Sequence, residues 1–168
     1  MNQISSEPWF IFLSDWQKKL VELALELYEN ESRLKHNYCD YSFIIFPMAK
    51  AYEGFLKKWL FSLRLINQKV YEGKRFRIGR ALNPDLPHRL RDEYWLYDDI
   101  VKRCGSDSGR FIWDTWLQCR NQVFHFFPKG KGSFALKEAK ERLDMIVEAM
   151  TLATEDTIGV IAKKVFSS

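Results

Sequence analysis

The sequence predicts an all-α protein, an up-and-down bundle of about five helices. Apolar residues recur at three- and four-residue steps along most of the chain, and the alternation typical of strands is nearly absent. With 168 residues, of which 46% are hydrophobic and 29% charged, the chain is long enough to bury a core and does not have a disordered composition. We therefore expect one helical domain over residues 1–168.

The first two predicted helices have recognisable start signals. Ser14, followed three residues later by Gln17, has the form of a capping box, and the helical period then continues to about residue 34. A second helix is expected from about Ser42 or Pro47 to Ile66, because proline is tolerated in a first turn and the apolar period persists over this stretch. Both helices should line the core.

The segment 67–88 has the composition of a long loop, because it contains two glycines and two prolines. It is also basic, with only Glu72 as an acidic residue before Asp85. Such charge either guides a polyanionic ligand toward a site or belongs to a solvated surface. The basic residues of this segment are Lys69, Lys74, Arg75, Arg77 and Arg80.

Three further helices are expected at Arg89–Arg103, from Asp107 or Ser108 to Phe126 or Phe127, and at Phe134–Val165. Pro128 should end the middle one, because the residue before a proline is pushed out of the helical region. Ser133 should cap the last helix, and Gly159 should weaken it.

Several classes of protein are disfavoured by the composition. The apolar runs are far shorter than the roughly 20 residues that a membrane span needs, and the first residues do not resemble a secretory signal. Cys39, Cys104 and Cys119 lack metal-ligand spacing and are odd in number, which argues against a zinc site and a disulfide framework. We expect a cytoplasmic protein with reduced thiols and no metal or other cofactor, whose net charge of +4 is compatible with a polyanionic partner.

The segment Arg120–His125, with the sequence RNQVFH, groups side chains suited to chemistry on a phosphate. Arginine can grip two phosphate oxygens, and histidine exchanges a proton near neutral pH. On a regular helix Asn121 and His125 share a face, whereas Arg120 and His125 differ by about 140° around the axis. A common phosphate would then have to approach the helix end, or a second copy of the chain would have to complete the site. Alternatively, His125 only complements the negative end of the helix dipole.

This segment resembles the R-N-x-x-x-H form of the R-x4-6-H motif of HEPN domains, an all-α family of metal-independent ribonucleases of bacterial toxins and defence systems. The segment Ala51–Lys57 is similar to the part of the HEPN domain of ribonuclease LS toxins (the RnlA and LsoA group) that carries an acidic residue. The resemblance covers about residues 38–150. Glu53 occupies the acidic position, although it is also placed to form an ordinary helical pair with Lys57.

The resemblance implies cleavage of RNA by attack of its own 2′-hydroxyl, leaving a 2′,3′-cyclic phosphate. His125 would transfer protons, Arg120 would hold the phosphate, Asn121 would orient groups or contact a hydroxyl, and Glu53 would orient Arg120 or His125 or share the acid/base work. The aromatic residues around this segment are interpreted as core, with base stacking as the alternative. The predicted RNA-binding residues are Lys57, Lys74, Arg75, Arg77, Arg80, Lys129 and Lys131.

The resemblance also implies partners: an RNA substrate, a second copy in a homodimer and a protein antitoxin. Phe127 stands where many HEPN toxins carry a tyrosine that accepts nucleotide groups, so control by that modification is not expected. The competing hypothesis is a non-catalytic helical module that binds RNA or a protein. A metal-dependent nuclease is poorly supported, because no carboxylate-rich constellation accompanies the histidines.

Overall fold

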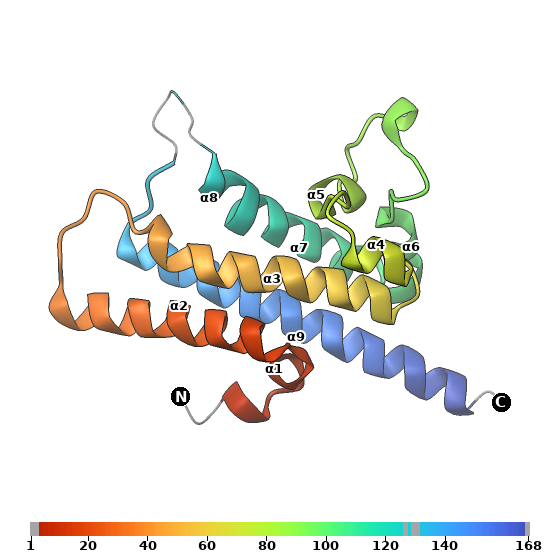
Figure 1. Cartoon of the computed structure of the whole chain (residues 1–168), viewed down its shortest axis with the longest axis horizontal. Helices are drawn as coiled ribbons and strands as arrows, with labels where there is room; N and C mark the ends of the chain where they lie inside the picture. The colour runs from red at the N-terminus through yellow and green to blue at the C-terminus, as the bar shows by residue number, and fades with distance from the viewer. Residues whose placement is uncertain (1–3, 126–127, 129–131, 167–168) are drawn as a thin grey trace.

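All regular elements in the part of the chain that the structure describes are helical, which confirms the all-α prediction (Figure 1). The computed structural model describes residues 4–125, 128 and 132–166, with side chains up to residue 155. The elements are η1 (Ile4–Ser6), α1 (Pro8–Phe12), α2 (Asp15–Leu34), α3 (Ser42–Ser62), α4 (Gln68–Glu72), α5 (Ile78–Ala81), η2 (His88–Leu90), α6 (Tyr97–Cys104), α7 (Ser106–Trp116), the π-helical turn η3 (Leu117–Asn121), α8 (Gln122–Phe124) and α9 (Leu136–Phe166).

The helix α3 lies at the centre of the bundle and packs against α2, α9 and the α7–α8 segment (Figure 1). Because neighbours cover it on several sides, apolar side chains around most of its circumference are buried. Two buried hydrogen bonds attach it to other helices: the Tyr52 hydroxyl donates to the Ile112 carbonyl of α7 at 3.0 Å, and Trp59 Nε1 donates to the Ala153 carbonyl of α9 at 3.1 Å. Along the chain, α2, α3, α7–α8 and α9 alternate in direction, as in an up-and-down bundle (Figure 1).

The predicted start of α2 is confirmed in detail. The Ser14 hydroxyl accepts a hydrogen bond from the Gln17 backbone N–H, and the Gln17 side chain accepts one from the Ser14 backbone N–H at 2.8 Å. This capping box satisfies two N–H groups that the first turn would otherwise leave unpaired. The helix runs to Leu34, as expected.

The helix α3 begins at Ser42, so Pro47 lies within it. The predicted end at Ile66 is wrong, because the helix stops at Ser62 and the chain turns at Arg64, whose φ of 58° is left-handed. Hydrogen bonds from the backbone N–H groups of Arg64 and Leu65 back to the last carbonyls of the helix close this turn.

The segment between α3 and α7 differs most from the prediction. The expected loop 67–88 contains the short helices α4 and α5, and the helix predicted at Arg89–Arg103 exists only as α6, from Tyr97 onward. Side chains hold the preceding residues in a non-helical path: Arg91 donates to the carbonyls of Pro84 and Leu86, and Trp95 Nε1 donates to that of Asn83 at 2.8 Å. These bonds satisfy loop carbonyls that a helix would have paired internally.

The last helices also begin and end at other residues than predicted. The helix expected after Asp107 or Ser108 starts at Ser106, behind Gly105 with a φ of 88°, and its last helical residue is Phe124. The helix thus ends two or three residues earlier than expected, because His125 already has an extended backbone.

The helix α9 starts at Leu136 and continues past Gly159 to Phe166. Ser133 is therefore not its cap; Glu138 instead accepts a hydrogen bond from the Ala135 backbone N–H at 2.7 Å. The preceding Phe134 is held by Asp40, whose carboxylate accepts from the Phe134 backbone N–H at 3.0 Å.

Candidate active site

An ion pair joins two of the predicted site residues across the bundle. Glu53 lies in the middle of α3 and Arg120 in the π-helical turn η3, and Arg120 Nε stands 3.4 Å from Glu53 Oε2. The side chains are 46% and 29% exposed, respectively. Ion pairs with this exposure contribute about 0–1 kcal/mol to stability, so folding alone gives little reason for the pairing.

Two aromatic rings contact the guanidinium of Arg120. Its Cζ lies 4.8 Å from the centroid of Phe124 and 5.3 Å from that of Trp116. Phe124 in turn stacks on Phe46 of α3, with centroids 4.3 Å apart. An arginine has five N–H donors in one plane, and Glu53 receives a bond from one of them, so the orientation is restricted while donors remain for an anion.

The turn that carries Arg120 and Asn121 is a π-helix, which the sequence did not predict. The backbone N–H of Gln122 bonds the Leu117 carbonyl, five residues back, instead of the carbonyl four residues back. Such single wide turns occur often at functional sites. The 140° separation of Arg120 and His125 expected on a regular helix does not apply here, because the wide turn changes the angle between them.

The buried side of the π-helical turn is occupied by Cys119. Its thiol lies 3.6 Å from the Arg142 carbonyl and 3.7 Å from the Met145 sulfur of α9. Burial raises the pKa of Cys119 to about 12, although the nearby Arg142 opposes the rise. The side chain is therefore a neutral thiol that packs the turn against α9 and is not a nucleophile.

His125 is exposed and directly follows the last helical residue, with φ −114° and ψ 137°. Within the described residues it makes no ion pair or hydrogen bond. The expected helical pairing of Asn121 with His125 is wrong, because His125 has left the helix. Its imidazole lies at the end of α8, five residues after Arg120.

The position of Glu53 is set by its neighbours in α3. Tyr52 is fully buried and bonds α7 two helical turns before Arg120, which fixes the register of the two helices. Burial raises the pKa of the Tyr52 phenol well above its ordinary value. On the other side, Gly54 lies against Gln17, and a Cβ at this glycine would come within 2.3 Å of Gln17 Nε2. A side chain at this position would displace the Gln17 amide on α2, so the glycine lets the two helices lie close together beside Glu53.

The predicted RNA-binding residues divide into those that bond other residues of the chain, those that line a pocket and those outside the described residues. Lys57, Arg77 and Arg80 are engaged within the chain: Lys57 Nζ donates to the Gly73 carbonyl at 2.8 Å, Arg77 Nη1 donates to the Lys74 carbonyl at 3.0 Å, and Arg80 pairs with Asp92 at 2.9 Å. Lys74 and Arg75 are exposed and line a pocket. The remaining predictions, Lys129 and Lys131, lie outside the described residues, as does Phe127.

The basic segment lies close to Arg120. Gly79 of α5 approaches the indole of Trp116, such that a Cβ at this glycine would come within 2.7 Å of Trp116 Nε1. The same indole supports Arg120. The Lys57 bond to Gly73 further ties this segment to α3, one turn after Glu53.

Within the described residues, no group of three His, Cys, Asp or Glu side chains gathers as a metal ion would require. None of the helices in this part of the chain combines the length and apolar character needed to cross a membrane. The structure thus joins Glu53 to Arg120 directly and places Asn121 in the same π-helical turn as Arg120. His125 follows the end of α8. Comparisons of the chain with protein-family models, with curated proteins and with solved structures give no match, so the HEPN resemblance depends on the motif residues alone.

Proposed function

We propose that the chain is a metal-independent endoribonuclease of the HEPN type. The observation that supports the proposal is the Glu53–Arg120 ion pair, which holds a partly exposed arginine of the motif five residues before the exposed His125. The pair is too exposed to matter much for stability, and the arginine retains donors for a phosphate.

In the proposed reaction the 2′-hydroxyl of RNA attacks the adjacent phosphorus, and the bond from phosphorus to the 5′ oxygen breaks. A base takes the proton of the 2′-hydroxyl and an acid gives one to the departing 5′ oxygen, so the products are a 2′,3′-cyclic phosphate and a 5′-hydroxyl. Arg120 stabilises the charge on the phosphate oxygens, and Glu53 orients Arg120. Asn121 contacts a hydroxyl or orients the substrate.

Proton transfer is assigned to His125. One histidine cannot act as base and acid in the same step, and we propose that a two-fold homodimer supplies the second from its other copy. The free position of His125 at the end of α8 supports this arrangement, because an exposed side chain outside the helix is accessible to a partner.

The test is cleavage of end-labelled RNA in EDTA by the wild type and by single variants. His125→Ala should slow cleavage by at least about 100-fold, because acid/base catalysis contributes about 10²- to 10⁴-fold. Arg120→Ala should also reduce the rate, and the wild-type product should end in a cyclic phosphate. His88→Ala is the matched control, since His88 is exposed and lies in η2. Equal rates for wild type and His125→Ala would remove the proposal.

The proposed biological setting is a cytoplasmic toxin or phage-defence nuclease restrained by a directly binding protein antitoxin. Expression of the wild-type chain should then arrest bacterial growth, and His125→Ala should relieve the arrest. Normal growth with active wild-type protein would argue against a toxin.

A second candidate is a non-catalytic helical module that binds RNA or a protein. The contacts of Arg120 with Glu53 and two rings favour it, because a purely structural arginine is held in the same way. No cleavage by any variant, together with an unfolded Arg120→Ala protein, would support this candidate.

A further inference from the structure

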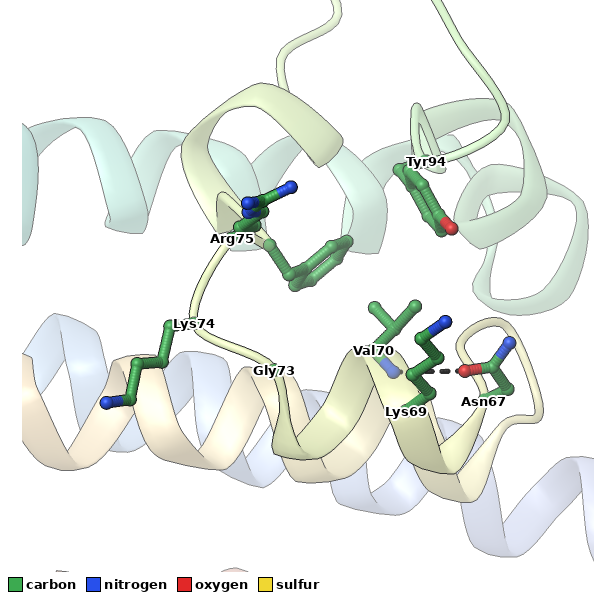
Figure 2. A pocket seen from close by; sticks show the side chains of 8 residues that line it. Asn67, Lys69, Val70, Gly73, Lys74, Arg75 and Tyr94 are labelled. Carbon is green, nitrogen blue, oxygen red and sulfur yellow. Dashed lines mark hydrogen bonds between the residues drawn. The ribbon is translucent and has the colours of Figure 1, made fainter.

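A pocket of about 760 Å³ lies beside α4 and α5 (Figure 2). This volume is typical of sites for small ligands, which range over about 300–1,000 Å³. We name it the α4 pocket. Its lining residues are Asn67, Lys69, Val70, Gly73, Lys74, Arg75, Phe76 and Tyr94.

The α4 pocket combines cationic and aromatic side chains. Figure 2 shows Arg75 and Tyr94 on opposite sides of it, with Lys69 and Asn67 below. Phe76 and Tyr94 meet edge to face, with ring centroids 6.2 Å apart and an interplanar angle of 80°. Because the rings are nearly perpendicular, a flat ligand would stack on one ring and not between the two.

The cations of the α4 pocket differ from others nearby in having no partner. Within the described residues neither Lys69 nor Arg75 makes an ion pair or a side-chain hydrogen bond, whereas Lys57, Arg77 and Arg80 are all engaged. Unpaired cations beside aromatic rings suit an anion joined to a flat ring.

The walls of the α4 pocket are built by specific contacts. Asn67 Oδ1 accepts from the Val70 backbone N–H at 3.0 Å and so caps α4, which leaves the Asn67 amide N–H₂ as a donor. Tyr71 stacks on Phe61 of α3 with centroids 4.8 Å apart, and Lys57 bonds the Gly73 carbonyl. These contacts hold α4 and Gly73, and with them one side of the α4 pocket, against α3.

We infer that the α4 pocket binds one nucleotide of single-stranded RNA, with the base stacked on Tyr94 and a phosphate held by Lys69 and Arg75. A stacked base, a phosphate and an amide donor together match the groups of a nucleotide. Tyr94 is 40% exposed, so its ring is accessible to a base. The inference rests on the proposed function, because it assigns the α4 pocket a role in binding the RNA substrate. From the pocket, the RNA would continue past Lys57 to Arg120.

The experiment measures binding separately from cleavage. Fluorescence anisotropy of a labelled single-stranded RNA is recorded with the His125→Ala protein, in which cleavage is slowed under the proposed mechanism. Adding Tyr94→Leu should weaken binding roughly 5- to 100-fold through the loss of one stacked base. Trp16→Ala is the matched aromatic control, because Trp16 is 63% exposed and lies on α2.

The phosphate contacts have their own readout. Replacing both Lys69 and Arg75 by alanine should weaken binding and lower the slope of log affinity against log salt by about 0.7, since each neutralised phosphate of a single strand contributes about 0.7. Arg89→Ala is the charge control, because Arg89 is exposed and does not line the α4 pocket. Circular dichroism checks that each variant is folded.

The outcomes separate the hypotheses. If the Tyr94 and Lys69/Arg75 variants bind RNA as tightly as the Trp16 and Arg89 controls, the inference is overturned. If adenosine monophosphate binds in a Tyr94-dependent way while RNA binding ignores these variants, the α4 pocket is a free-nucleotide site and the inference is also overturned. If the wild type does not cleave RNA but RNA binding still depends on the α4 pocket, the inference is supported and only the proposed ribonuclease activity is overturned.

Discussion

The guanidinium of Arg120 forms an ion pair with Glu53 and contacts the rings of Trp116 and Phe124. The rings restrict the plane of the group, and the carboxylate restricts its rotation within that plane. An arginine held in this way loses less side-chain freedom when it binds a phosphate, so orientation is provided before the substrate arrives.

At the residue scale, Glu53→Gln tests whether the carboxylate orients Arg120. We expect the free energy of unfolding to fall by less than about 1 kcal/mol, because the pair is exposed. Cleavage should fall about 10- to 100-fold, because a small displacement of a positioned group has an effect of that order. Urea unfolding and initial cleavage rates measure the two effects.

Glu22→Gln serves as the control for Glu53→Gln, since Glu22 is an exposed glutamate of α2, away from Arg120. Unchanged cleavage in Glu53→Gln, or a loss of several kcal/mol of stability, would show that Glu53 has a structural role instead.

At the element scale, the π-helical turn η3 decides where Arg120 lies. The turn between Leu117 and Gln122 holds one residue more than a regular α-helical turn. Cys119 packs this turn against α9. In a regular helix each following residue would be displaced by about 100° around the axis. Arg120 would then point away from Glu53.

Deleting Gln118 should convert this turn to a regular helix. We expect the helix content to be retained and cleavage to fall, because the deletion shifts Arg120 along and around the helix axis relative to Glu53. Circular dichroism and the cleavage assay measure the two results. Gln118→Ala keeps the chain length and should cleave normally; equal activity of the deletion variant would show that the wide turn is dispensable.

A second element-scale contact joins the segments that precede α3 and α9. Asp40 accepts hydrogen bonds from the backbone N–H groups of Ser42 and Phe134, both at 3.0 Å, and from the Ser42 hydroxyl at 2.6 Å. Burial by itself raises the pKa of Asp40, but the three bonds outweigh it and the pKa lies below the ordinary 3.8.

Asp40→Ala should therefore lower the free energy of unfolding by about 1.5–3 kcal/mol, the range for hydrogen bonds to a charged group. Asp40→Asn should cost less, because its amide oxygen still accepts. Since the folded pKa is lowered, the contribution is present above pH 3.8 and is lost as the pH falls through the folded value. Urea unfolding at neutral and acidic pH checks this; a constant difference between wild type and Asp40→Ala at all pH values would contradict it.

At the scale of the whole molecule, two buried acids limit stability at high pH. Tyr52 and Cys119 are inaccessible to solvent, and burial raises the pKa of both, that of Cys119 to about 12. In the unfolded chain both groups ionise at lower pH. Between the unfolded and folded pKa values only the unfolded state loses its proton, so stability must fall as the pH rises.

We therefore expect the free energy of unfolding to decrease above about pH 9, by about 1.4 kcal/mol per pH unit for each of the two groups once the unfolded form is ionised. Urea unfolding from pH 8 to pH 11 measures the slope. Cys119→Ala should be less stable at pH 8 because it leaves a cavity, and it should show a shallower alkaline slope. An unchanged slope in this variant would exclude the thiol as a cause.

The helical class and the capping box at Ser14 could be predicted from the sequence, and its motifs also supply the residues of the candidate site. These features depend on local periods and on side-chain types, which a single sequence displays directly. The course of residues 83–96 is not evident from the sequence, because it depends on bonds of the Arg91 and Trp95 side chains to loop carbonyls, which no helical period displays.

Only the tertiary structure decided that Glu53 and Arg120 meet, that a π-helical turn carries the arginine and that His125 lies outside the helix. The two paired residues are 67 positions apart, and no local pattern encodes such a contact. The same holds for the basic residues of segment 67–88: folding decided that Lys69 and Arg75 line the α4 pocket and that Arg80 pairs with Asp92. The physical reason is that packing between helices, and not helical propensity, determines which polar side chains find partners.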